Sequence, residues 1–127
     1  MNHLRLYEEF SERLYHSIDV QEYDNFFSKD VITFDDNHIQ IIKKITDGFH
    51  LFADSSKLLV CLRRESKPET HIYMNRIDDE YYLVKVIVRY FEVGSFIRRF
   101  YLCDQFDGLI SFLEDMKSDN FSFVNFI

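Results

Sequence analysis

Two carboxylates and a lysine are spaced so that they could hold a divalent cation. Asp54 is followed, after ten intervening residues, by Glu65-Ser66-Lys67, and the apolar run Leu58 to Leu62 lies between them. Carboxylate oxygens are the ligands that Mg²⁺ takes from proteins, and a nearby lysine can position or activate the attacking water. The pattern therefore raises metal-dependent hydrolysis as one hypothesis.

This arrangement resembles the motif of the PD-(D/E)xK nuclease superfamily, which would imply a small Mg²⁺-dependent nuclease. Three features depart from that motif. No proline precedes Asp54, Glu65 and Lys67 fall at a strand end beside Pro68, and strands rather than a helix follow. We therefore favour a charged turn here and keep the nuclease as an alternative.

The histidines and cysteines lack the spacing of a metal site. Only His50 and Cys61 could approach one another, if their strands pair. Cys61 and Cys103 lie in apolar runs without a CxxC partner, which predicts reduced, buried thiols. The sequence has no GxSxG elbow, no glycine-rich phosphate loop and no HExxH motif. We expect no catalytic residue, no metal and no cofactor, and hence not an enzyme.

Length and composition predict one compact domain. The chain has 127 residues, of which 46% are hydrophobic and 17% aromatic, so it can bury a core without disulfides. No run approaches the roughly 18 apolar residues of a membrane helix. Glu8, Glu9 and Glu12 interrupt the start of the chain, which is unlike a signal peptide. We expect a single α+β domain over residues 1-127, in the cytoplasm or another intracellular compartment and not in a membrane.

Helical spacing marks both ends of the chain. Apolar residues recur at three- and four-residue steps over residues 3 to 18, which predicts an amphipathic helix. A short helix is expected over residues 19 to 28, with Asp19 as its N-cap. A final helix should begin after Asp104, its expected N-cap, with these residues on one face: Phe106, Leu109, Ile110, Leu113 and Met116.

An antiparallel β-meander is expected between these helices, with the C-terminal helix packed on the sheet. Its strands are the β-rich runs between turn residues: Leu58 to Arg63, His71 to Ile77, Tyr81 to Phe91 and Phe96 to Cys103. The ending from Phe121 to Ile127 is too apolar to remain in water, so it should form an edge strand or dock on a partner.

Residues 38 to 46 fit two structures. Ile41, Ile42 and Ile45 suit a helix turn, whereas Ile39 and Ile41 suit a strand. Because Asp47-Gly48 supplies the positive backbone angles of a two-residue turn, we predict a hairpin that returns over Phe49 to Ala53.

The charge of the chain is unevenly distributed. The net charge is -7, but residues 57 to 103 carry 9 basic and 6 acidic side chains. Within Tyr81 to Phe91, strand alternation puts Tyr82, Val84, Val86, Val88 and Tyr90 on one face, the expected core face. The opposite face mixes rings with cations, and Arg98 or Arg99 on the next strand could extend it. It could be a solvated sheet face whose long side chains cover apolar neighbours, or a surface that binds a partner, for which the candidate residues are Tyr81, Lys85, Arg89, Phe91 and Arg98.

The sequence favours a non-catalytic protein-interaction module: an adaptor, a chaperone-like protein or an assembly subunit. Its partner would bind the sheet face or the C-terminal strand, and a homodimer remains open. The order helix, sheet, helix resembles small dimeric secretion chaperones in outline, without a shared motif. Nucleic acid is not expected as a partner, because a net charge of -7 repels phosphate. An alternative is a virus-type inhibitor whose acidic helices imitate nucleic acid, with Glu8, Glu9 and Glu12 as its contacts.

Overall fold

The computed structural model describes residues 14–27, 31–65, 69–90 and 94–118. The elements in chain order are β1 (Tyr15–Ile18), α2 (Val20–Phe27), β2 (Val31–Ile32), α3 (Asp36–Ile45), β3 (His50–Asp54), β4 (Leu59–Arg64), β5 (Glu69–Ile77), β6 (Tyr81–Tyr90), β7 (Ser95–Asp104) and α4 (Gln105–Ser118). The fold is therefore α+β, as the sequence predicted. No helix in these ranges is long and apolar enough to cross a membrane.

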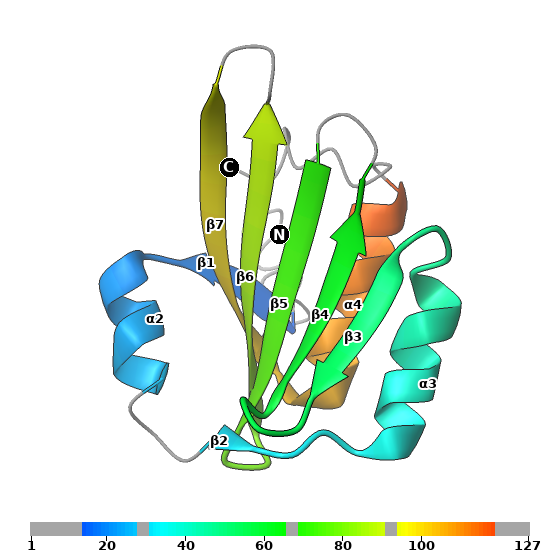
Figure 1. The fold of residues 1–127 in the computed structure, drawn as a ribbon. Helices are drawn as coiled ribbons and strands as arrows, with labels where there is room; N and C mark the ends of the chain where they lie inside the picture. The colour runs from blue at the N-terminus through cyan, green and yellow to red at the C-terminus, as the bar shows by residue number, and fades with distance from the viewer. Residues whose placement is uncertain (1–13, 28–30, 66–68, 91–93, 119–127) are drawn as a thin grey trace, which may run out of the picture.

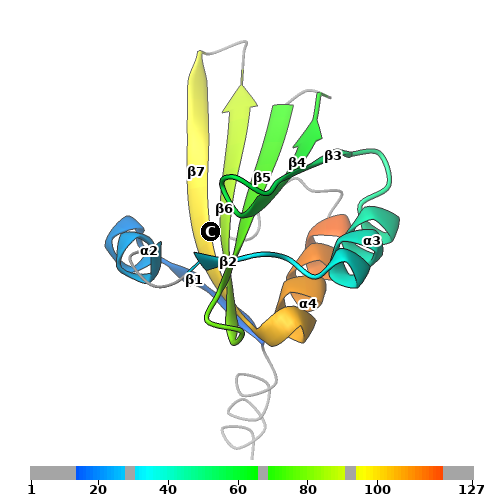
Figure 2. The ribbon, with the colours of Figure 1, turned by 60° about the horizontal axis from the view of Figure 1, so that its bottom comes forward.

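The described strands form one antiparallel sheet. Its order is β1-β7-β6-β5-β4-β3, and β2 pairs with the end of β5. Each strand from β3 to β6 pairs with the next one along the chain, which confirms the meander. α3 and α4 cover one face of this sheet, whereas α2 lies on the opposite side (Figures 1 and 2).

Strand β6 sorts its side chains as its alternation predicts. Tyr82, Val84, Val86 and Val88 are at most 2% exposed and belong to the main core. That core lies between the sheet and the helices α3 and α4, whose apolar faces supply Ile42, Leu109, Phe112, Leu113 and Met116. The C-terminal helix therefore packs on the sheet as expected.

A second, smaller core lies on the other face of the sheet, under α2. It is built from Ile18, Tyr23, Ile77, Leu83 and Leu102. Burial there raises the pKa of Tyr23 to about 12, so its hydroxyl stays neutral. α2 confirms the helix predicted over 19 to 28, and Asp19 Oδ1 caps it by accepting from the Glu22 backbone N–H at 2.8 Å.

The hairpin predicted over residues 38 to 46 is wrong, because this segment is helix α3. Asp35 caps it by accepting from the Asn37 backbone N–H, and Lys43 and Lys44 lie in the last turn, where the helix dipole favours cations. The helical spacing buries Ile42 completely against the main core. Gly48 does take a positive φ of 93°, but in the loop that follows the helix.

The helix predicted over residues 3 to 18 is wrong at its C-terminal end, since Tyr15–Ile18 is strand β1. Pairing with β7 outweighs the local helical spacing, because it buries Ile18 in the small core and packs Tyr15 edge-on against Phe112. Residues 1 to 13 lie outside the described ranges, as do Phe91 and the predicted strand from Phe121 to Ile127.

Gly108 lets α4 approach β1 closely. A Cβ built on Gly108 would lie 2.3 Å from the Leu14 carbonyl oxygen, a contact that no side chain could make without displacing the backbone. The same oxygen accepts a hydrogen bond from the Asp104 backbone N–H. The junction of β7 and α4 is thereby fastened to the start of β1.

Candidate functional site

On the sheet face opposite α3 and α4, helix α2 covers only part of the strands, and we call the part that no described helix covers the open face (Figures 1 and 2). It is defined by side chains of β4 to β7: Cys61, Arg63, Glu69, His71, Tyr73, Lys85, Ile87, Arg89, Phe96 and Arg98. The register aligns them in rows across the strands. Lys85 lies between Tyr73 and Phe100, Ile87 lies between His71 and Arg98, and Arg89 lies between Glu69 and Phe96.

Three of the predicted binding residues, Lys85, Arg89 and Arg98, come together on the open face. Arg89 and Arg98 are exposed and Lys85 is half-buried. Tyr81 is not with them. Its ring lies 5.9 Å from that of Phe26 at the other end of β6, where it packs on the small core. Phe91 lies outside the described residues.

Lys85 is held by an aromatic neighbour. Its Nζ lies 5.0 Å from the centroid of the Tyr73 ring, directly across the strand pair. A cation over the face of a ring is attracted by the ring quadrupole. The ammonium is therefore positioned before any partner arrives.

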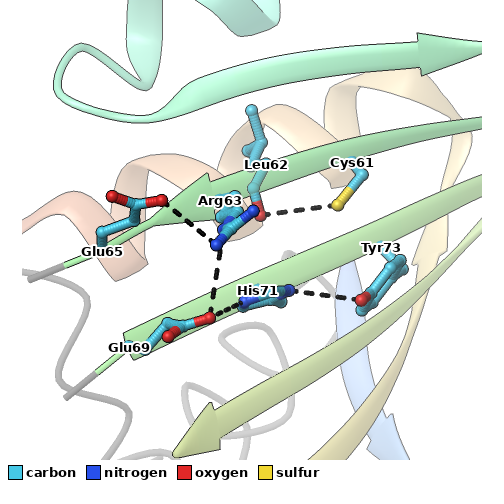
Figure 3. Close-up of polar contacts among 7 residues, drawn as sticks. All are labelled: Cys61, Leu62, Arg63, Glu65, Glu69, His71 and Tyr73. Carbon is cyan, nitrogen blue, oxygen red and sulfur yellow. Dashed lines mark hydrogen bonds and ion pairs between the residues drawn. The ribbon is translucent and has the colours of Figure 1, made fainter.

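A line of polar contacts runs along β5 and onto β4 (Figure 3). His71 Nε2 lies 2.5 Å from Glu69 Oε1, and its Nδ1 lies 3.3 Å from the Tyr73 hydroxyl. The alternation of β5 places these three side chains on one face. The hydrogen bond from His71 is the main cause that lowers the pKa of Glu69, and the charges of Arg63 and Arg89 act in the same direction.

Arg63 joins β4 to this line. Its Nη2 lies 3.1 Å from Glu65 Oε1 and its Nε lies 3.9 Å from Glu69 Oε1. Sequence reasoning missed Glu69, His71 and Arg63 as members of the face. The steps from Glu69 to His71 to Tyr73 could have indicated a shared face, but pairing with Lys85 and Arg89 depends on the register between strands.

Cys61 also lies on the open face, opposite Tyr73. Its Sγ contacts the Leu62 carbonyl oxygen at 3.8 Å. Burial raises the pKa of this thiol, and the nearby charges of Arg63 and Lys85 only partly oppose that effect. The sulfur is therefore protonated at neutral pH and is a weak nucleophile.

The predicted thiols are confirmed as free, with Cys103 buried and Cys61 half-buried. β3 does pair with β4, which places His50 opposite Arg63 and one row away from Cys61. No group of three or more metal-ligating side chains occurs among the described residues.

The carboxylates of the nuclease-like motif do not meet. Asp54 ends β3 in the turn before β4, whereas Glu65 follows the far end of β4. The six residues of β4 span roughly 17 Å at the usual rise of a strand. Asp54 instead accepts hydrogen bonds from the Ser56 hydroxyl and backbone, which lower its pKa. It acts as a turn residue, and Lys67 lies outside the described residues.

The end of the open face is hollowed where β6 turns into β7. A cavity of about 510 Å³ is lined there by Ile87, Arg89, Tyr90, Gly94, Ser95, Phe96 and Arg98. Phe96 is 58% exposed, and the Arg98 guanidinium lies 5.6 Å from the centroid of its ring. Rings and guanidinium groups together suit a site for acidic and apolar groups.

No protein-family model matches the chain, and searches of curated proteins and of solved structures gave no match. The geometry of the open face is therefore the basis for a functional proposal.

Proposed function

We propose that the protein is a non-catalytic interaction module, an adaptor or assembly subunit, that binds an acidic protein surface with its open face. One observation carries the proposal. Lys85, Arg89 and Arg98 gather with the exposed ring of Phe96 on a part of the sheet that no described helix covers. Its combination of aromatic rings and arginines resembles the composition of protein interfaces, in which both are enriched.

The charge of the face selects the partner. Arg63, Lys85, Arg89 and Arg98 outnumber the acidic side chains Glu65 and Glu69 on and beside it, although the whole chain carries -7. A basic patch on an acidic molecule orients an acidic partner toward that patch. The net negative charge of the whole chain would repel nucleic acid at long range, so we propose a protein as the partner.

Several side chains of the open face are already held in place by contacts within the protein. Lys85 rests on Tyr73, and His71 lies between Glu69 and Tyr73. Ordering side chains costs free energy when it happens on binding, so groups that are already held lose less. The centre of the face therefore favours binding over a solvated surface of mobile chains.

The test removes two charges while it keeps polar side chains at both positions. Full-length protein is immobilised and exposed to nuclease-treated extract of its native source, and bound proteins are identified by mass spectrometry. Lys85→Gln with Arg89→Gln should lose the acidic partner while the protein stays folded, with a melting temperature lower by only about 5 °C, because the contacts of these cations with Tyr73 and Glu69 are lost. Glutamine is preferred to glutamate because Arg89 lies opposite Glu69, where a reversed charge would set two carboxylates against each other.

Lys43→Gln with Lys44→Gln is the matched control. It removes the same charge from exposed positions on α3, which packs on the other face of the sheet. The control should retain the partner. If both double variants retain it equally, or if capture depends on nucleic acid in untreated extract, the open face is not the binding surface for a protein.

A further inference from the structure

Among the described strands, β7 has a partner along the whole of one side but only along part of the other. β6 pairs with it from Ser95 to Asp104, whereas β1 pairs only with residues 100 to 103. Within the described ranges, Ser95 to Arg99 therefore have no neighbouring strand on the β1 side, and Figure 1 shows this part of β7 extending beyond β1. A strand edge of this kind presents backbone donors and acceptors that a further strand can pair with.

A hollow lies beside this edge. The chain leaves the sheet at Asp19 to begin α2, and a cavity of about 510 Å³ remains there, lined by residues 17 to 20 and by Phe96, Arg98, Arg99 and Phe100. The space continues the line of β1 along β7. A guest strand could thus extend the ladder that β1 begins.

The side chains along this edge indicate which residue types an added strand should carry. Phe96 and Ile97 are 58% and 37% exposed, and they point to opposite faces of the sheet. Arg98 and Arg99 follow them, again on opposite faces, and the Arg99 guanidinium donates to the Arg98 carbonyl oxygen at 2.9 Å. A guest would need apolar residues opposite the first pair and acidic residues opposite the second.

We propose that residues 95 to 99 of β7 bind an extended acidic peptide segment of another protein by β-strand addition. The guest strand runs antiparallel to β7, like β1, and two acidic residues followed by two apolar residues lie opposite Arg99, Arg98, Ile97 and Phe96 in turn. Backbone hydrogen bonds hold the strand, and the four side-chain pairs select the sequence.

A second copy of the chain fits this edge less well. Pairing of two β7 edges would bring Arg98 and Arg99 of both molecules into one short ladder, with like charges close together. Asp19 is the one acidic side chain among the described residues that line the hollow. The charge of the edge thus favours a different, acidic partner.

The edge of β7 shares Phe96 and Arg98 with the open face but does not include Lys85, and strand addition does not require that the proposed function be correct. Lys85 lies on β6, with Phe100 rather than the free half of β7 as its neighbour. The experiment therefore includes the Lys85→Gln variant as a separate arm.

The probe is a fluorescent peptide of about ten residues, a usual upper length for a strand, with a central pair of glutamates followed by valine and phenylalanine. Binding to the full chain is measured by fluorescence anisotropy. A peptide with N-methyl groups on alternate residues keeps the composition but cannot pair as a strand. It should bind about tenfold or more weakly, since each lost hydrogen bond contributes of order 1 kcal/mol. Phe96→Ser and Arg98→Gln with Arg99→Gln should each weaken the unmodified peptide more than Lys85→Gln does. Lys43→Gln with Lys44→Gln, on the other side of the sheet, should leave its binding unchanged.

Equal binding of the two peptides would overturn strand addition. Peptide binding that Lys85→Gln weakens and that Arg98→Gln with Arg99→Gln leaves unchanged would also overturn it. Sedimentation of the chain without peptide provides the remaining test. A dimer that Phe96→Ser dissociates would assign the edge to a second copy and overturn the peptide proposal. A monomer that binds only the unmodified peptide supports the proposal.

Discussion

Lys85 lies across the strand pair from Tyr73, and its Nζ is 5.0 Å from the centroid of the tyrosine ring. We predict a coupling of about 0.5–1 kcal/mol between the two side chains, which is usual for a cation over a ring near the surface. A double-mutant cycle of Lys85→Gln and Tyr73→Leu, followed by urea denaturation, measures it. Tyr73→Phe should preserve the coupling, because the ring remains and only the contact of the hydroxyl with His71 is lost. A coupling of zero would mean that the ammonium is not held by the ring.

Ile41 and Ile42 should differ sharply in their effect on stability. Ile42 is fully buried and Ile41 is 42% exposed, because α3 turns neighbouring residues to different sides. Ile42→Ala should lower the free energy of unfolding by about 2–5 kcal/mol, and Ile41→Ala by less than about 1 kcal/mol. A strand through Ile39 and Ile41 would reverse this order, so the same two variants also test the helix against the hairpin.

Local sequence patterns predicted the sheet well but not what covers it. The alternation of β6 identified its buried and outward sides, since each side chain of a strand is fixed by a period of two. Leu83 lies on the side opposite the main core, as the alternation requires, yet it is fully buried because α2 packs over that end of the strand. Coverage by a distant element depends on tertiary structure, and the same reason moves Tyr81 out of the predicted site.

The competing signals around Asp47-Gly48 show a second limit of prediction from local sequence. A glycine with positive φ suits a hairpin turn and also the loop after a helix, and Gly48 has that conformation in the second setting. The segment before Gly48 forms a helix because a helix can bury Ile42 against the main core. For the candidate site, Lys85, Arg89 and Arg98 could be predicted from alternation, whereas the pairing of Arg89 with Glu69 required the register.

Gly108 should not tolerate a methyl group. Alanine is normally better than glycine inside a helix by about 1 kcal/mol, but its Cβ would lie 2.3 Å from the Leu14 carbonyl oxygen. The clash involves backbone, which cannot rotate away, so we predict a net destabilisation of about 1–3 kcal/mol for Gly108→Ala. Glu114→Ala, at an exposed position of the same helix, should change stability by about 0.5 kcal/mol or less. A stabilised Gly108→Ala protein would show that α4 does not approach β1 this closely.

Glu69 should make the free energy of unfolding depend on pH. Its pKa lies below the usual 4.5 because the side chain of His71 hydrogen-bonds the carboxylate and because Arg63 and Arg89 lie nearby. A carboxyl whose pKa is lower in the folded than in the unfolded state binds fewer protons when folded. Its contribution is therefore fully present above the unfolded value and is lost as the pH falls through the folded value.

The comparison of wild type with Glu69→Gln isolates this contribution from that of other carboxyls such as Asp54, whose pKa is also lowered. The difference in free energy of unfolding, measured by urea denaturation, should be largest near neutral pH. It should shrink steadily as the pH is taken below 4.5. Glu65→Gln is the matched control, because Glu65 also contacts Arg63 but its side chain is 64% exposed, so solvent should screen the pair. A difference between wild type and Glu69→Gln that stays constant over this range would show that the carboxylate is not stabilised by its neighbours in the folded chain.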